Sequence, residues 1–379
     1  MIKTTIIPAA LLAGTIIGAG IFALPYVSTK AGIVVASAAA VLFTALMVSI
    51  HTMYADVVAD IGHQHRFAGV AKKYMGKKGY TGAIAMTIVH MLFVLAIYIL
   101  FAVDFFKIIL PSEWSVYGAI LFWIGGSIAA YMSVRAVSIV ETIAVVGMMM
   151  IVGMVVIYGI TSDVHASIPV MGNSIVSLLV PFGVILFALN GRPAIPSVVA
   201  YGGEEGERKK RIRKAIIIGT ISAALVYVLF VIGVIGASEK VTQDTISGLM
   251  VPAWAQVLLG VLGILAVITS YIAVAQDVKK SLEHDVSLSS WIAGIVTVFI
   301  PVAIYMAHLG SLVQLLEVAG GIFVSLEGLM IICMWNKHKK ESNVPIAGKI
   351  PSWWMIIMRG VFVVSMVYVL YEIIIKIIT

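Results

Sequence analysis

The chain has 379 residues, of which 61% are hydrophobic and only 11% charged, and its formal net charge is +7. Soluble domains average roughly 45–50% apolar and about 25% charged residues, and a folded soluble protein needs a charged exterior. The composition therefore excludes a soluble enzyme, a disordered chain, a coiled coil and a collagen-like rod, and it predicts an all-α polytopic membrane protein.

Eleven apolar stretches are long enough to cross a hydrocarbon core of roughly 30 Å, which takes about 20 helical residues. They lie near 4–27, 31–55, 80–103, 115–132, 138–160, 173–200, 214–236, 252–276, 288–307, 311–335 and 353–378. The first stretch is longer than the apolar core of a signal peptide, which has about 7–15 residues, so we expect it to be retained.

Lys and Arg residues in the short loops predict the orientation of the spans. If the N-terminus is cytoplasmic, 20 of these residues face the cytoplasm and 4 face outside, while Arg192 lies within a span. This asymmetry predicts a multi-pass protein of the cell membrane with a cytoplasmic N-terminus and an external C-terminus. It also explains the basic charge without nucleic acid, and the single cysteine, Cys333, allows neither an internal disulfide nor a cysteine metal cluster.

The segment 56–79 joins the second and third predicted spans. Its apolar residues fall on one helical face beside four lysines, which favours an amphipathic helix at the cytoplasmic interface; a positively charged loop with some helical content is the alternative. The apolar residues are Phe67, Val70, Ala71, Tyr74 and Met75. Asp56, Asp104 and Asp277 lie at span ends and are expected at the membrane interface.

Two spans contain residues that break helices. The first includes GTIIGAGIFALP at 14–25, and the sixth includes FALNGRPAIP at 187–196. In a helix interior glycine costs about 1 kcal/mol and proline about 3 kcal/mol, and Pro193 also removes a backbone donor. Freed backbone groups at membrane depth are tolerated only inside protein or along a cavity.

Close helix packing through Gly14 and Gly18 would by itself explain the first break. The sixth span favours a functional site over close packing, because an arginine at membrane depth is energetically costly and indicates function. Gly18 and Gly191 are 173 residues apart, and the first and sixth spans hold corresponding places in two halves. Paired broken segments of this kind indicate a secondary transporter with inverted repeats.

The motifs at 14–25 and 187–196, with AGVAKKYMGK at 68–77, resemble the amino acid/auxin permease group. They are most similar to its hydroxy/aromatic amino acid permeases, within the amino acid–polyamine–organocation superfamily. The resemblance implies a LeuT-like 5+5 inverted repeat plus one extra helix, with helices 1 and 6 broken. The repeats would span 1–165 and 166–335, and 336–379 would hold a cytoplasmic loop and the eleventh helix.

The resemblance also implies an amino acid site at the two breaks. Freed N–H groups of the first break would bind the substrate carboxylate, and freed carbonyls of the sixth would bind its ammonium. The residues expected at this site are Gly14, Thr15, Gly18, Ala19, Gly20, Phe187, Ala188, Leu189, Asn190 and Gly191. A neutral or aromatic amino acid is the favoured substrate, although the family pattern predicts a neutral or aromatic residue near position 192, where this chain has arginine.

The coupling ion is either sodium or a proton. In sodium-coupled relatives, an adjacent threonine/serine pair and a nearby helix carbonyl coordinate sodium; the resemblance matches these positions to Thr269, Ser270 and the carbonyl of Ala266. The alternative is that the two hydroxyls bond their own helix. Sodium is the only metal expected. For a proton, Glu317 is the first choice among the ionisable residues in spans, with a purely structural carboxylate as the alternative; the others are Glu327, Glu141 and His90.

Arg192 could pair with an acidic substrate, close a gate through a carboxylate, or extend to the cytoplasm. Tyr98 is a second gating candidate, although a membrane tyrosine is commonly a packing residue. The predicted function is import of an amino acid by proton or sodium symport with alternating access. An ion-independent exchanger or facilitator is the alternative.

A membrane-embedded enzyme is less favoured, because no catalytic motif is present; His63 and His65 form a histidine pair without a nearby third ligand, and no catalytic residue is assigned. No filter-like repeat indicates a channel. We expect no cofactor, no nucleic acid and no obligate protein partner, only the substrate and the lipid bilayer.

Overall fold

The computed structural model describes residues 2–61, 67–129, 131, 134–202, 207–338 and 345–378. Within these ranges the chain is helical, and its only β-type pairing is an isolated bridge between Ser238 and Leu249. The predicted histidine pair at His63 and His65 lies outside the described residues, and so does the side chain of Glu141.

In the described part of the chain, eight stretches each form a single helix, although one of them, α4, is kinked at Gly76. They are α3 (Ile33–Ile61), α4 (Phe67–Ile109), α5 (Ser112–Ala129), α6 (Val134–Thr161), α9 (Arg208–Gly236), α10 (Ala253–His284), α11 (Ser290–Met306) and α14 (Ser352–Ile378).

Three further stretches are interrupted helices. The first contains η1 (Ile2–Ile6), α1 (Ile7–Ile16), η2 (Ala19–Ala23) and α2 (Leu24–Ala31); the second contains α7 (Ile175–Ala188), η3 (Arg192–Ala194) and α8 (Ile195–Ala200); the third contains α12 (Leu312–Val318), η5 (Ala319–Val324) and α13 (Ser325–His338). A short turn, η4 (Ile246–Gly248), precedes α10.

Each of the eleven predicted stretches coincides with one of these continuous or interrupted helices. Among the described residues, seven helical segments are long and apolar enough to cross a membrane, and the bent pair Thr4–Ile16 and Ala19–Ala31 is an eighth. Val145–Thr161 and Ser290–Met306 are apolar but shorter. The chain is therefore an all-helical, multi-pass membrane protein.

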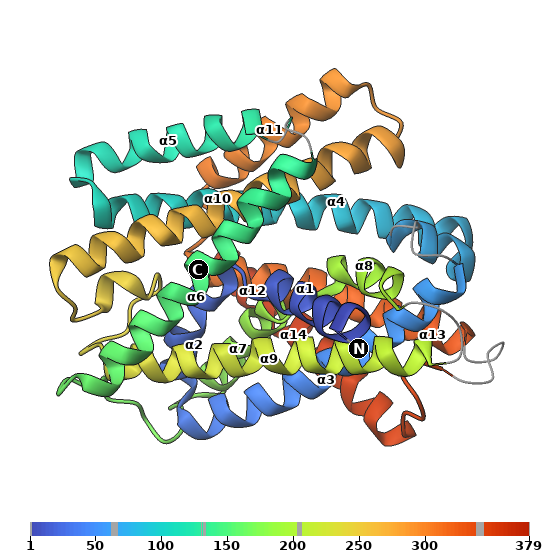
Figure 1. The fold of residues 1–379 in the computed structure, drawn as a ribbon, viewed down its shortest axis with the longest axis horizontal. Coiled ribbons are helices and arrows are strands. Elements are labelled where there is room, and N and C mark those ends of the chain that lie inside the picture. The colour runs from blue at the N-terminus through green and yellow to red at the C-terminus, as the bar shows by residue number, and fades with distance from the viewer. Residues whose placement is uncertain are drawn as a thin grey trace.

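The interrupted helices lie in the middle of the molecule. Figure 1 shows α3, α4 and α9 running along its long dimension, with α1, α7, α8 and α12 between them. Helix α1 packs against α8 and α9, and α7 packs against α2 and η5. Segments far apart in the chain thus meet at the centre, where their irregular backbone is enclosed by protein as the bilayer requires.

The predicted interfacial segment is largely helical. Helix α3 continues to Ile61, and α4 begins at Phe67 rather than near residue 80 and passes through a kink at Gly76, where φ is +70°. Only glycine adopts this left-handed backbone readily. Phe67, Val70 and Ala71 are buried against the rest of the protein.

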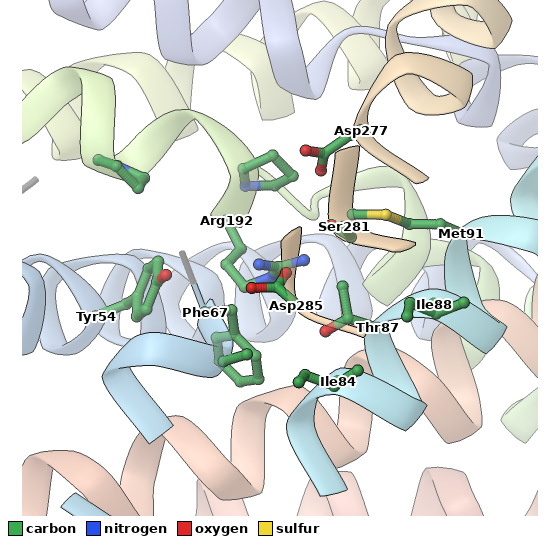
Figure 2. A pocket seen from close by; sticks show the side chains of 13 residues that line it. Tyr54, Phe67, Ile84, Thr87, Ile88, Met91, Arg192, Asp277, Ser281 and Asp285 are labelled. Carbon is green, nitrogen blue, oxygen red and sulfur yellow. The ribbon is translucent and has the colours of Figure 1, made fainter. Parts of the chain in front are cut away.

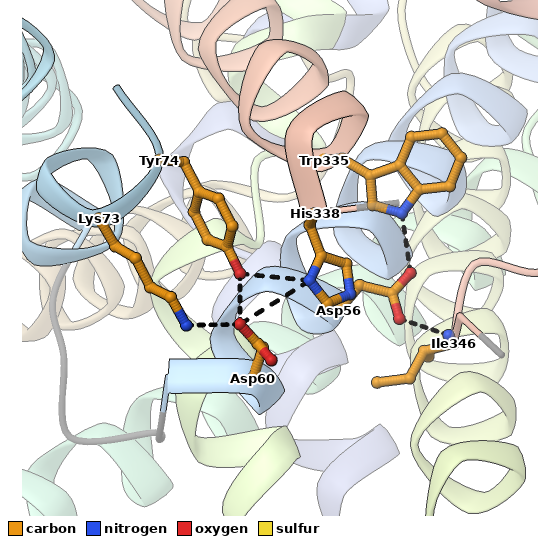
Figure 3. Close-up of polar contacts among 7 residues, drawn as sticks. All are labelled: Asp56, Asp60, Lys73, Tyr74, Trp335, His338 and Ile346. Atoms are coloured by element: carbon orange, nitrogen blue, oxygen red, sulfur yellow. Dashed lines mark hydrogen bonds and ion pairs between the residues drawn. The ribbon is translucent and has the colours of Figure 1, made fainter. Parts of the chain in front are cut away.

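Two carboxylates at the end of α3 tie together elements that are distant in sequence (Figure 3). Asp56 accepts hydrogen bonds from Trp335 Nε1 at 2.9 Å and from the backbone N–H groups of Ile346 and Ala347. Asp60 accepts bonds from Lys73 and Tyr74, both at 2.6 Å, and the Tyr74 hydroxyl lies 3.2 Å from His338 Nδ1.

Asp56, which we expected at the membrane interface, is buried inside the protein, with only 3% of it exposed. Burial is tolerated because three donors satisfy the carboxylate. The network fixes the end of α13 and the segment after it against α3 and the start of α4.

The third interrupted helix is irregular where it meets α7. A Cβ at Gly320 would lie 1.7 Å from the carbonyl oxygen of Gly183, and one at Gly183 would lie 2.6 Å from that of Glu317. The two backbones touch, so both positions require glycine. The sequence pointed to breaks in the first and sixth spans, but not to this π-helical turn at Ala319–Val324.

Candidate functional site

The first break consists of Ile17 and Gly18, which leave the helical conformation between α1 and η2. The Ile17 N–H still bonds the Ala13 carbonyl at 2.8 Å, and the Gly18 N–H bonds the Ile16 carbonyl at 2.8 Å. The first freed donors are those of Ala19 and Gly20, because the opening N–H groups of a helix have no partner within it.

Gly14 and Thr15 lie within α1 and not in the irregular segment. The Thr15 hydroxyl is exposed and bonds the Leu11 carbonyl at 3.0 Å, and a Cβ at Gly14 would contact Val145 of α6. Neither residue is brought together with the second break.

The second break consists of Leu189, Asn190 and Gly191, between α7 and η3. Asn190 Oδ1 accepts a bond from the Arg192 N–H at 3.2 Å, which stabilises the turn locally. The Gly191 N–H donates to His51 Nε2 at 3.1 Å, and His51 Nδ1 lies 3.1 Å from the Thr220 hydroxyl. Helix α3 therefore holds the backbone of this break through His51, and α9 supports His51 through Thr220.

The two breaks lie against each other. A Cβ at Gly20 would lie 3.0 Å from Ala188 Cα, and one at Gly191 would lie 2.8 Å from a side-chain carbon of Ile16. The Tyr227 hydroxyl of α9 donates to the Ile16 carbonyl and lies 2.8 Å from the Ala188 carbonyl. Residues about 170 positions apart thus form one compact site.

Arg192 forms a buried ion pair. Its Nε donates to Glu327 Oε2 at 2.9 Å, and the two side chains are 9% and 2% exposed. His90 Nδ1 lies 3.6 Å from Glu327 Oε1, and the guanidinium sits 4.8 Å from the centre of the Phe67 ring. The arginine charge is therefore paired within the protein in this structure.

A cavity of about 220 Å³ opens beside this ion pair. Figure 2 shows Arg192 reaching into it, with Phe67 and Thr87 from the first half of α4 and Asp277 from the end of α10 around it. Tyr54 of α3 closes another side. The cavity thus approaches the second break from the end of the molecule where α3 ends and α4 begins.

The three residues predicted to hold sodium lie together on α10. The hydroxyls of Thr269 and Ser270 both donate to the Ala266 carbonyl, at 2.9 and 3.1 Å. Tyr98 is buried on α4, and its hydroxyl interacts with that of Ser270. Helix α10 also packs against η2 of the first break.

Glu317 lies on α12 beside α7, where a Cβ at Gly183 would lie 2.6 Å from the Glu317 carbonyl oxygen. It is 8% exposed, and within the described part of the chain its carboxylate has no hydrogen-bond or ion-pair partner. The groups that act on it electrostatically are Glu372 and Tyr368 of α14. The structure does not bring Glu317 together with Arg192, whose carboxylate partner is Glu327.

His51, Thr220 and Tyr227 were missed by the sequence reasoning. Each is a polar residue inside an apolar span, which is a signal of function or of a buried partner. That signal does not name the partner, because the contacts join residues 140 and 211 positions apart.

Three comparisons relate the chain to known proteins. A model of the tryptophan/tyrosine permease family matches residues 1–371. "Glutamine transporter 2" of Aliivibrio fischeri is 23% identical over 349 residues, covering 88% of this chain and 89% of that protein. The crystal structure of MhsT in complex with L-phenylalanine aligns with a TM-score of 0.56 and 13% identity over 96% of both chains. The fold is therefore LeuT-like.

Proposed function

This chain belongs to the tryptophan/tyrosine permease family, and from that premise we propose that it is a secondary active transporter that imports a neutral or aromatic amino acid by alternating access. The observation that carries the proposal is the contact between the two breaks, where a Cβ at Gly20 would lie 3.0 Å from Ala188 Cα. Because the two breaks are adjacent, a single amino acid bound beside them would reach backbone groups of both.

The substrate carboxylate would accept bonds from the freed N–H groups of Ala19 and Gly20. Its ammonium would donate to carbonyls at the end of α7, in the segment from Phe187 to Asn190. Helix polarity supports this orientation, because N-terminal ends attract negative charge and C-terminal ends attract positive charge. Gly20 and Gly191 allow the two broken helices to approach each other closely, because a Cβ at either position would lie within 3.0 Å of the opposite helix.

A neutral side chain is favoured because Arg192 already has a counter-charge in Glu327. An acidic substrate would have to compete with that buried carboxylate for the guanidinium. The names of the relatives support the same class, since one is described as a glutamine transporter and another holds phenylalanine.

The coupling ion would be sodium or a proton. The oxygen atoms of Ala266, Thr269 and Ser270 suit a hard cation, and the packing of α10 against η2 supports a link to the first break. Glu317 is the proposed proton carrier, supported by its burial without a cationic partner in the described residues. No metal other than sodium and no cofactor is proposed.

Alternating access would move spans 1, 2, 6 and 7 against spans 3, 4, 8 and 9 of an eleven-span protein. Residues 1–165 and 166–335 would form the two repeats, and 336–379 would add a cytoplasmic loop and the last span. Arg192 and Tyr98 would act as gates, the first beside the cavity and the second beside Ser270. We place the protein in the cell membrane with the N-terminus cytoplasmic and the C-terminus outside.

The test is uptake of radiolabelled amino acids into proteoliposomes that hold the purified protein. The panel contains tryptophan, tyrosine, phenylalanine, serine, threonine, alanine, glutamine, glutamate and arginine, each with no gradient, an inward sodium gradient or an inward proton gradient. Accumulation of neutral or aromatic amino acids under one gradient supports the symporter. Uptake that needs no gradient and speeds up with internal amino acid supports the exchanger, and failure to transport any of them by folded protein refutes the proposal.

A further inference from the structure

The Tyr227 hydroxyl lies where two helices end. Ile16 is the last residue of α1 and Ala188 is the last residue of α7. Their carbonyl oxygens both lie within hydrogen-bonding distance of the same phenolic oxygen, with the Ala188 contact at 2.8 Å. Tyr227 itself belongs to neither broken helix, and it is 5% exposed in the middle of α9.

One hydroxyl cannot satisfy both carbonyls at once. A phenol has one proton to donate, whereas the last carbonyls of a helix lack partners within it and carry partial negative charge. The Ile16 carbonyl also accepts the Gly18 N–H at 2.8 Å, so among the described residues it is the Ala188 carbonyl that lacks a donor when the hydroxyl proton goes to Ile16. The point between them favours a cation that has several N–H groups.

The phenolic oxygen is also an acceptor. While its proton is given to one carbonyl, the oxygen can accept two hydrogen bonds; the backbone N–H of Gly18 interacts with it, and the other lone pair can receive an N–H group of a ligand. A primary ammonium has three N–H groups, and this point offers three acceptors: the carbonyl oxygens of Ile16 and Ala188 and the oxygen of Tyr227. The three acceptors therefore match the three N–H groups of a primary ammonium, and no N–H group is left unpaired.

We propose that Tyr227 is a specificity-determining residue that contacts the substrate ammonium and selects primary α-amino acids over N-methylated ones. The inference rests on the proposed transport function and deepens it. Without substrate, the hydroxyl holds the ends of α1 and α7 together. With substrate, it stays in place, bonded to one carbonyl, and accepts the third N–H of the ammonium.

An N-methyl group would remove one N–H and place a methyl carbon against an acceptor. An unsatisfied polar group in a buried site costs about 1–3 kcal/mol, which corresponds to a loss of affinity of about 5- to 150-fold. Replacing Tyr227 by Phe removes the third acceptor and leaves space for the methyl group. Discrimination between the two amines should therefore decrease in that variant.

The experiment measures how well L-tryptophan and Nα-methyl-L-tryptophan compete with uptake of the labelled amino acid that the wild-type protein transports best. We expect a preference of about tenfold or more for the primary amine in the wild type, falling to about threefold or less in Tyr227→Phe. Tyr271→Phe is the matched control, because that buried tyrosine of α10 bonds Ser127 and not the breaks. Its preference should equal that of the wild type.

Two results would overturn the inference. Equal competition by both amines in the wild type would overturn it even if Tyr227→Phe fails to fold, and an unchanged preference in a folded, transporting Tyr227→Phe protein would do the same. In either case the proposed function survives, since the wild type still transports. Absence of amino acid transport by the wild type would instead refute the proposed function itself.

Discussion

The buried ion pair between Arg192 and Glu327 allows a quantitative test of how the second break is held. The perturbation is Glu327→Gln, which keeps the shape and the hydrogen-bonding oxygen but removes the charge. At the N–O distance of 2.9 Å, the attraction of two unit charges is about 6 kcal/mol for an effective dielectric constant of about 20. Because both charges lost their hydration on folding, removing one partner should lower the free energy of unfolding by about 3–5 kcal/mol.

The assay is unfolding of the purified protein in mixed micelles by titration with sodium dodecyl sulfate. Glu207→Gln is the matched control, since that carboxylate lies 3.8 Å from Lys210 and both side chains are largely exposed; its effect should be about 0–1 kcal/mol. The double variant Arg192→Met, Glu327→Leu removes both charges, and we expect it within about 2 kcal/mol of the wild type. The remaining cost is the lost contact of Arg192 with Phe67.

If Glu327→Gln lowered the free energy of unfolding by less than about 1 kcal/mol, the reasoning would be refuted, because a desolvated arginine without its counter-charge destabilises the folded protein by more than that. The same conclusion would follow if the double variant were as unstable as the sum of the single variants. His90 lies 3.6 Å from Glu327, so His90→Gln should be measured in parallel to separate its contribution.

Three further outcomes are expected. Gly20→Ala should reduce uptake at least tenfold while Gly18→Ala retains it, because a Cβ meets Ala188 at 3.0 Å in the first case and nothing closer than 3.9 Å in the second; equal activity of the two variants would contradict the proposed site. If the proton is the coupling ion, Glu317→Gln should abolish accumulation driven by a proton gradient but keep exchange of internal for external substrate, and an unchanged dependence on external pH would exclude Glu317 as carrier. If sodium is the coupling ion, Thr269→Val should raise the sodium concentration for half-maximal uptake at least tenfold, whereas sodium activation like that of the wild type would remove Thr269 from the site.

The sequence by itself determined the class of protein, the positions of its helices and the two main breaks. Hydropathy is a local property that reflects a hydrocarbon layer of roughly 30 Å. Glycine and proline interrupt a helix wherever they occur, so the motifs at 14–25 and 187–196 were sufficient to locate the irregular backbone of the first and sixth spans. The helical face at Phe67, Val70 and Ala71 was equally visible, although the structure buries it in protein rather than leaving it free.

Only the tertiary structure decided which side chains meet. Successive residues of a helix are rotated by about 100°, so an uncertainty of one or two residues in a helix position leaves the direction of a side chain undetermined. The pairing of Arg192 with Glu327 rather than Glu317, the burial of Asp56 beneath Ile346 and the contact of Tyr227 with two helix ends all depend on that rotation. These contacts join different elements of the fold and residues more than 130 positions apart, except that Tyr227 and Ala188 are separated by 39. Packing against neighbouring helices sets their rotation, and that information is distributed over the whole chain rather than held in any one span.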